Sequence, residues 1–194
     1  MLKAFNDFDD IKGYEKTSSL PKGGYGLKIK DAVVKTNSVG QYVHLKMDIA
    51  EGDYKGYFTE DYDNQDSEEK KWHCNSLLSV PKDDGSERDG WTKRKFKTVI
   101  EVLEASNAGY HFDWDEEKFK GLIIGGLFNN KEYYRKDGSI GTTINLARLI
   151  PIEQVRSANY KLPDDKRIER DEESSSDEGF VTVSDAEMKS LPFD

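Results

Sequence analysis

The sequence predicts a mainly β fold, namely a small five-stranded barrel with one helix between the third and fourth strands and an acidic C-terminal tail. Three observations predict it. Apolar and polar residues alternate along residues 41–49 (QYVHLKMDI), as they do in a half-buried strand. Asp137-Gly138 separates two β-prone runs, which is typical of a hairpin. Apolar residues at helical spacing run from Phe96 to Leu103.

The first two strands are predicted as a hairpin joined by the short polar loop at residues 36–40. In the first strand, alternation places Lys28 and Lys30 with Ala32 on the outward face, and Tyr25, Leu27, Ile29, Asp31 and Val33 on the other. In the second strand the aliphatic set is Val43, Leu45, Met47 and Ile49, and the outward set is Tyr42, His44, Lys46 and Asp48.

A third strand is predicted around residues 55–58, and the charged, turn-rich segment 59–90 is interpreted as a loop. The helix is expected to begin after an N-cap at Thr92 and to end near residues 107–109. Residues 121–134 and 140–150 are the last two strands, and Gly125-Gly126 indicates a bulge or a sharp bend.

Five strands with a helix between the third and fourth is the plan of the OB-fold, a small barrel whose face and loops bind oligonucleotides and oligosaccharides. Other small barrels and α+β sandwiches have the same order of elements. We expect an N-terminal arm at residues 1–20, the OB-fold-like domain at 21–156 and a disordered tail at 157–194.

The tail carries most of the charge. The chain of 194 residues has 29 Lys and Arg against 38 Asp and Glu, a net charge of -9, and its last 24 residues hold eight acids and one base. The preceding part is therefore nearly neutral. Such an acidic, Ser-rich segment buries too little apolar surface to fold. A tethered polyanion would compete with DNA for a basic groove, so net acidity is compatible with DNA binding.

Several classes of protein are disfavoured. No apolar run approaches the ~20 residues of a membrane-spanning helix. The N-terminus lacks the apolar stretch of a secretory signal and Cys74 is the lone cysteine, so we expect a cytoplasmic protein. Phosphate-loop, nucleophile-elbow and zinc motifs do not occur, so we expect no cofactor, no metal and no enzymatic activity. A metal-dependent nuclease using Asp61, Asp63 and Asp66 is the less favoured enzymatic alternative.

The outward row of the second strand combines an aromatic ring, an imidazole and an ammonium group. Proteins bind single-stranded nucleic acid with this mixture, because rings stack on bases for roughly 1 to 3 kcal/mol each and basic groups neutralise phosphates. The alternative is that the exposed lysines only protect an edge strand from pairing with another chain and that some of the rings belong to the core. The three tryptophans are expected to pack. The predicted DNA-binding residues are Lys28, Lys30, Tyr42, His44, Lys46, Tyr54, Tyr57, Phe58, Lys93, Arg94, Tyr133 and Arg135.

Residues 5–155 resemble phage-type single-stranded-DNA-binding proteins of Gram-positive bacteriophages and prophages. The resemblance lies in Tyr14-Glu15, in residues 20–25 (LPKGGY), in residues 49–58 (IAEGDYKGYF), and in the later GGLF and Tyr133-Tyr134. It implies an OB-fold that binds single-stranded DNA during replication and recombination. These motifs consist of turn and strand residues and include no catalytic signature.

The C-terminal tip resembles that of bacterial single-stranded-DNA-binding proteins, which recruit replication enzymes through an acidic tip ending in Pro-Phe. The resemblance implies that replication or recombination proteins are partners, with Asp185, Glu187, Leu191, Pro192 and Phe193 as the contacts. Here Asp194 follows the phenylalanine, and Lys189 interrupts the acids. The sequence is also compatible with a homo-oligomer. An interaction protein that mimics DNA and docks to a host enzyme is the alternative function.

Overall fold

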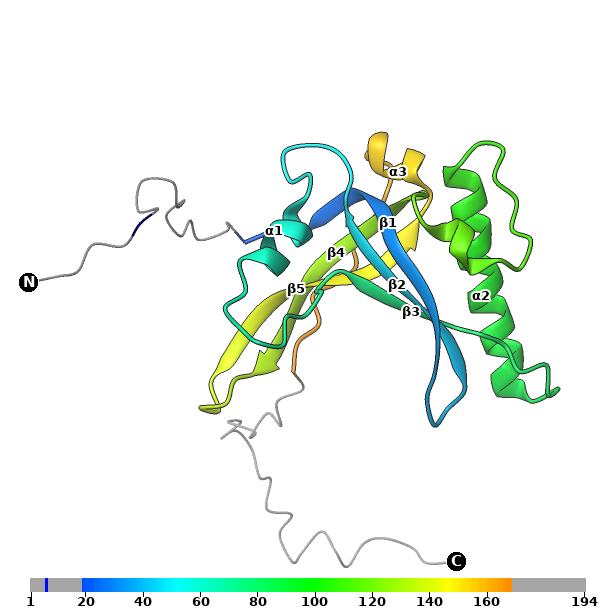
Figure 1. The fold of residues 1–194 in the computed structure, drawn as a ribbon, viewed down its shortest axis with the longest axis horizontal. Coiled ribbons are helices and arrows are strands. Elements are labelled where there is room, and N and C mark those ends of the chain that lie inside the picture. The colour runs from blue at the N-terminus through cyan, green and yellow to red at the C-terminus, as the bar shows by residue number, and fades with distance from the viewer. Residues whose placement is uncertain (1–5, 7–18, 169–194) are drawn as a thin grey trace, which may run out of the picture.

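The computed structural model describes residue 6 and residues 19–168. Five antiparallel strands form one open sheet in the order β3-β2-β1-β4-β5 (Figure 1). This confirms the mainly β fold, and α2 confirms the helix between the third and fourth strands. The elements are β1 (Gly23–Thr36), β2 (Gln41–Ile49), α1 (Tyr57–Asp63), β3 (Asn75–Ser79), α2 (Glu87–Ser106), the 3-10 helix η1 (Glu116–Phe119), β4 (Ile123–Tyr134), β5 (Ile140–Ile150) and α3 (Ile152–Arg156).

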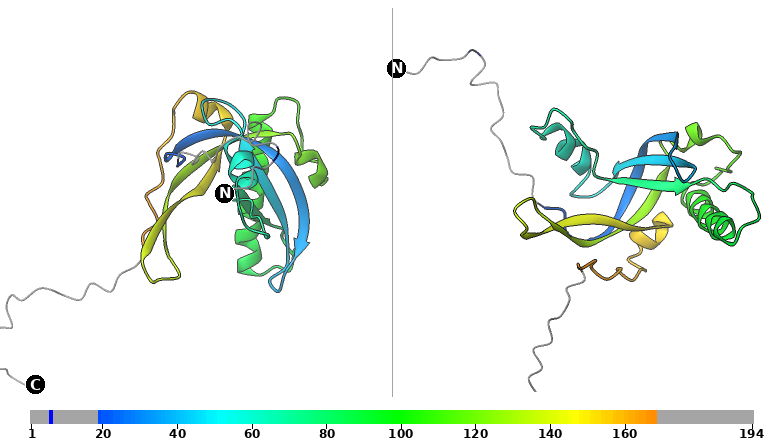
Figure 2. Two further views of the ribbon diagram at one scale, coloured as in Figure 1. Left: turned by 60° about the vertical axis from the view of Figure 1, so that its left-hand side comes forward. Right: turned by 90° about the horizontal axis from the view of Figure 1, so that it is seen from below.

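The long strand β1 belongs to both halves of the sheet. Its residues 23–28 pair with β4, and its residues 27–36 pair with β2. A register shift between Ile29 and Asp31 marks a bulge at the point where β1 passes from one partner to the other. Bulges bend a strand and increase its twist. The sheet therefore divides into a β1–β2–β3 wing and a β4–β5 wing, which diverge in the left view of Figure 2.

The core lies on the inner side of the sheet and includes residues of both wings, and α2 packs against it mainly over β4 and β3. Val43, Leu45 and Met47 are at most 3% exposed, as the alternation in β2 predicts. They share one apolar cluster with the α2 residues Phe96, Ile100 and Leu103. Each such side chain contributes roughly 1.5 to 3 kcal/mol by burial. The inner face of β2 is thereby fixed, which leaves Tyr42, His44 and Lys46 on its outer face.

The predicted third strand at residues 55–58 is wrong, because the chain enters helix α1 there. Gly56 precedes the helix with φ 81, a left-handed conformation that glycine adopts without strain. Asp48, predicted to face outward, is buried beneath the helix. Its carboxylate accepts hydrogen bonds from the backbone N–H groups of Ile49 (2.8 Å) and Phe58 (3.0 Å) and from the Thr59 hydroxyl. Asp48 therefore caps α1 from the neighbouring strand.

The true third strand, β3, lies inside the segment predicted as a loop and pairs with β2 along its whole length. Helix α2 also begins earlier than predicted. Its N-cap is Ser86 rather than Thr92, with the hydroxyl accepting from the Asp89 N–H at 3.1 Å. The first turn escaped prediction because it is polar and contains Gly90. The β4–β5 hairpin is confirmed, with Gly138 at φ 80 in its turn.

The bulge also changes which β1 residues face outward. Past it, Ala32 is the partner of the core residue Leu45, while Asp31 and Val33 are the partners of Lys46 and His44. The prediction that Asp31 and Val33 share the inner face is therefore wrong. A single extra residue reverses every later side chain of a strand.

The folded part continues beyond residue 156, where the sequence predicts that the tail begins. The Tyr160 hydroxyl accepts from the Gly24 N–H at 3.2 Å, and Asp165 accepts from the Asn130 N–H at 3.0 Å. Lys166 forms a parallel bridge with Lys131 of β4. Residues 157–168 thus pack against the sheet. Most of the predicted arm and the tail from residue 169 onward lie outside the described residues. Within the described part, no helix is both long and apolar enough to span a lipid bilayer.

Candidate nucleic-acid interface

The outer face of the β1–β2–β3 wing presents three cross-strand rows of side chains. Directly opposed residues of antiparallel strands lie on the same face. The register therefore places Tyr42, His44 and Lys46 of β2 in the middle of the surface. All three are half-buried, which leaves part of each side chain open to solvent. The rows are Lys35-Tyr42-Ser79, Val33-His44-Leu77 and Asp31-Lys46-Asn75.

One half of this face opens into a pocket of about 510 Å³, which we call the basic pocket. Its floor comes from the sheet, and its wall comes from the end of α1 and the segment that follows it. The floor residues are Lys35, His44, Lys46 and Asn75, and the wall residues are Tyr62, Lys70, Lys71, Trp72 and His73. Four lysines, two histidines and two aromatic rings thus surround one open space.

Hydrogen bonds fix the wall to the sheet. The Trp72 indole N–H donates to the Met47 carbonyl at 2.8 Å, which ties the wall to β2. The Gln65 side chain accepts from the Lys71 N–H at 2.7 Å and donates to the Lys71 carbonyl at 2.8 Å. Asn75 donates to the Trp72 carbonyl at 2.8 Å. The lysines and rings of the wall are therefore carried on a braced loop.

The aromatic and basic groups of the wall are interleaved. The Tyr62 and Trp72 rings lie 5.6 Å apart at an angle of 45°. The Lys70 ammonium lies 5.8 Å from the centre of the Tyr62 ring, within cation–π range. His73 Nδ1 lies 2.6 Å from an Asp61 carboxylate oxygen. The pocket therefore offers ring faces beside positive charge.

His44 reports the electrostatics of the pocket floor. Burial lowers the pKa of its imidazole, and the nearby Lys35 and Lys46 lower it further, against a smaller opposing effect of Asp31. Two ammonium groups thus influence His44 more strongly than one carboxylate does. A bound anion would reverse this balance, because a negative charge favours the protonated imidazole.

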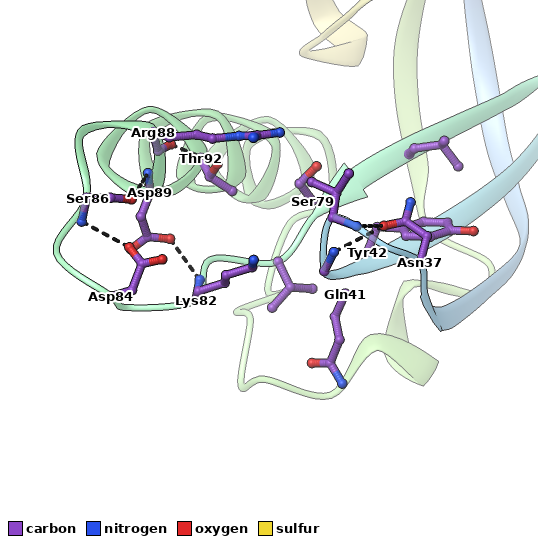
Figure 3. Close-up of a pocket in the computed structure, with 14 residues that line it drawn as sticks. Asn37, Gln41, Tyr42, Ser79, Lys82, Asp84, Ser86, Arg88, Asp89 and Thr92 are labelled. Atoms are coloured by element: carbon purple, nitrogen blue, oxygen red, sulfur yellow. Dashed lines mark hydrogen bonds between the residues drawn. The ribbon is translucent and has the colours of Figure 1, made fainter.

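A second pocket of about 320 Å³, the Tyr42 pocket, lies at the other end of the same face. Tyr42, Leu77 and Ser79 line it from the sheet, and Arg88 and Thr92 line it from α2. Figure 3 shows Arg88 on the side opposite Gln41 and Tyr42, with the Lys82 side chain extending toward Gln41. Tyr42 and His44 are successive outward residues of β2. The two pockets therefore adjoin along the strand, and we refer to them together as the groove.

The remaining predicted residues are dispersed. Lys28 and Lys30 are exposed on β1, and Lys30 occupies the bulge. Lys93 forms ion pairs with Asp83 and, at 3.3 Å, with the buried Asp89, which gives it a structural role. Arg94 is exposed, with its guanidinium 4.4 Å from the centre of the Trp91 ring.

Three predicted aromatic residues belong to a separate ring cluster near β4. Phe58 is 2% exposed and stacks on Phe128 at 5.9 Å, so its predicted role as an open platform is wrong. Tyr57 contacts Phe58 edge to face, and its hydroxyl accepts from the Leu20 N–H at 3.3 Å. Tyr54 packs against Tyr25 at 5.9 Å. Desolvation raises the pKa of Tyr57, as expected for a packed phenol.

Tyr133 and Arg135 lie at the tip of the β4–β5 hairpin, away from both pockets. The Tyr133 ring covers Gly141, where an added Cβ would come within 2.7 Å of the ring. Arg135 approaches Ser139 in the turn, with Nη1 and the hydroxyl 3.5 Å apart. The predicted tail contacts Asp185, Glu187, Leu191, Pro192 and Phe193 lie outside the described residues.

The sequence interpretation missed the wall of the basic pocket. Lys70-Lys71-Trp72-His73 does contain a usable signal, since basic and aromatic residues alternate there after Tyr62. Trp72 packs as expected. The prediction of packing is wrong for Trp91, which is 57% exposed, and holds in part for Trp114, which is 78% exposed but stacks on Phe96 at 6.2 Å.

No three His, Cys, Asp or Glu side chains among residues 6 and 19–168 are grouped so that they could hold a metal ion. No family model matches the sequence, and comparison with curated proteins gives no match.

Proposed function

We propose that this protein binds single-stranded DNA without sequence preference and without catalysis. The observation that carries the proposal is the groove on the outer face of β2 and β3, where lysines and aromatic rings from separate segments meet. Basic groups beside ring faces suit a strand whose phosphates and unpaired bases are both accessible. Ring stacking accepts any base, and phosphate contacts carry no sequence information, so tolerance of sequence follows.

The proposed fold is an OB-fold barrel, which the position of the groove supports. In that fold the face of strands 2 and 3 and the loops between strands 1 and 2 and between 4 and 5 bind oligonucleotides. Here the groove lies on β2 and β3 and includes Asn37 and Gly40 of the β1–β2 loop, whereas the β4–β5 loop lines neither pocket. The order β3-β2-β1-β4-β5 would become a closed barrel if β3 met β5.

The proposed biological role is to coat exposed strands during DNA replication and recombination of a bacteriophage or prophage, in the cytoplasm of the host. The acidic tail would recruit replication proteins and limit nonspecific contacts. The resemblance of the sequence to phage-type single-stranded-DNA-binding proteins supports this role, as does the nearly neutral folded part beside an acidic tail.

A fluorescence titration of the full chain with labelled oligo-dT tests the binding function. We expect submicromolar affinity, with log K falling linearly as log salt rises because counterions are released. Lys46→Gln should weaken binding severalfold and lower the salt slope by about one. Lys120→Gln is the matched control, since this exposed lysine lies outside both pockets, and it should bind like the wild type. Binding to duplex alone, or no binding, would contradict the proposal.

A further inference from the structure

Helix α2 carries an exposed basic stripe that continues from the groove. The Tyr42 pocket ends on α2 at Arg88 and Thr92. From there Arg88, Trp91 and Lys95 follow at i, i+3 and i+7, with Arg94 beside Trp91, so these side chains share one side of the helix. All four are exposed. The core residues Phe96, Ile100 and Leu103 occupy the opposite side of α2.

The cations of this stripe differ from the other basic residues of α2. Lys93 is paired with Asp83 and Asp89, and Lys97 approaches Glu101 at 3.6 Å. Within the described residues, Arg88, Arg94 and Lys95 form no ion pair with an acid. Glu87 in the first turn is the exposed acid closest in sequence. The charge of the stripe is therefore largely available to an anionic ligand.

Trp91 gives the stripe a stacking surface. Its side chain is 57% exposed although it is large and apolar. The Arg94 guanidinium lies 4.4 Å from the centre of the ring. An arginine in this position orients the indole and places a positive charge where a phosphate would lie next to a stacked base.

We infer that the stripe Arg88-Trp91-Arg94-Lys95 is a second contact site for the same DNA strand, reached after it leaves the Tyr42 pocket. This inference rests on the proposed function. Its occupant is single-stranded DNA, because the stripe combines cations with a ring and is continuous with the groove. Short oligonucleotides fill the groove alone, and longer ones also reach α2. Binding sites of about 4 to 16 nucleotides are typical of one such fold.

Oligonucleotide length separates this inference from the proposed function. We would titrate the full chain and its Trp91→Ala and Arg94→Gln variants with dT8 and dT20. Both variants should bind dT8 within about twofold of the wild type. For dT20 we expect Trp91→Ala to bind about tenfold more weakly, the loss expected for one stacked base. Lys97→Gln removes the same charge from another side of α2 and should bind both oligonucleotides normally. Thermal melts confirm folding.

Each result decides one question. If the wild type binds neither oligonucleotide, the result contradicts both the proposed function and this inference. Normal dT20 binding by Trp91→Ala and Arg94→Gln overturns the inference alone, and so does an equal loss for dT8 and dT20. If the variants change self-association in sedimentation and leave DNA binding intact, the stripe joins copies of the chain, which also overturns it.

Discussion

The outer face of β2 and the tip of the β4–β5 hairpin carry similar residues in different settings. Both present tyrosines beside basic groups, and both were predicted to bind DNA from sequence. On β2, side chains from three strands and the loop after α1 surround a pocket of about 510 Å³. At the hairpin tip, Tyr134 is 63% exposed, and Arg135 approaches a serine of its own turn. Residue type alone therefore does not define a site, because convergence of separate segments is needed.

The comparison also shows what holds each region in place. The groove rests on buried groups, since Asp48 caps α1 from β2 and Trp72 is hydrogen-bonded to the Met47 carbonyl. The hairpin tip is held by its own turn and by pairing within the hairpin. A ligand would meet preorganised groups in the groove and would have to order the side chains of the tip itself.

Charge reversal should give the largest difference between the two regions. Lys46→Glu with Lys70→Glu replaces two groove cations by anions, and we expect oligo-dT affinity to fall about 100-fold. Arg135→Glu with Lys136→Glu makes the same charge change at the tip and should cost less than about fivefold. Titrations at two salt concentrations measure both. An equal loss for the two double variants would show that the regions are equivalent.

Removing the cap of α1 should have the next largest effect. In Asp48→Ala, two backbone N–H groups and the Thr59 hydroxyl lose their acceptor. We expect the free energy of unfolding to fall by about 2 kcal/mol and, because the wall of the basic pocket follows α1, oligo-dT affinity to fall about tenfold. Urea denaturation and the titration measure these quantities.

Asp53→Ala is the control for this prediction, since Asp53 is exposed and its side chain makes no hydrogen bond within the described residues. It should leave stability and affinity unchanged. Wild-type affinity in a destabilised Asp48→Ala protein would mean that the wall is positioned independently of the α1 cap.

The smallest expected effect is a pH dependence from His44. Burial and then Lys35 and Lys46 lower the pKa of His44, so its imidazole releases the proton at a lower pH than an ordinary histidine does. A phosphate in the basic pocket stabilises the protonated form and raises this pKa. By reciprocity the affinity rises by about threefold as the pH falls below neutrality. His44→Gln should lose this rise. His111→Gln should keep it, because His111 lines neither pocket. A rise in affinity of equal size in His44→Gln would show that a group other than His44 causes the pH dependence.

Regular periodicity predicted much of the fold correctly. The alternation in β2, the apolar stripe of α2 and the Asp-Gly turn of the last hairpin are all local patterns. Each can be recognised within a single element or turn of the sequence. The failures lie where a single distant contact decides the structure. Helix α1 depends on Asp48 from another strand and on Gly56, and β3 has five residues whose pairing with β2 gives no clear local pattern.

The candidate site divides in the same way. Tyr42, His44 and Lys46 were predictable because their faces follow from the alternation of one strand. The bulge at Lys30 places Val33 on the same outer face as these three residues. Simple alternation along β1 does not predict this. The wall residues Tyr62 and Trp72 were missed because they lie in a charged segment without periodicity and reach the site through tertiary contacts.

Photocrosslinking gives the most direct test of the central claim, that DNA lies in the groove on the outer face of β2. An oligo-dT with 5-iododeoxyuridine at several positions would be irradiated in complex with the full chain, and the crosslinked peptides identified by mass spectrometry. The account predicts crosslinks at Tyr42, Tyr62 or Trp72. Crosslinks confined to Tyr133 and Tyr134, with none in residues 41–49 or 62–73, would contradict it.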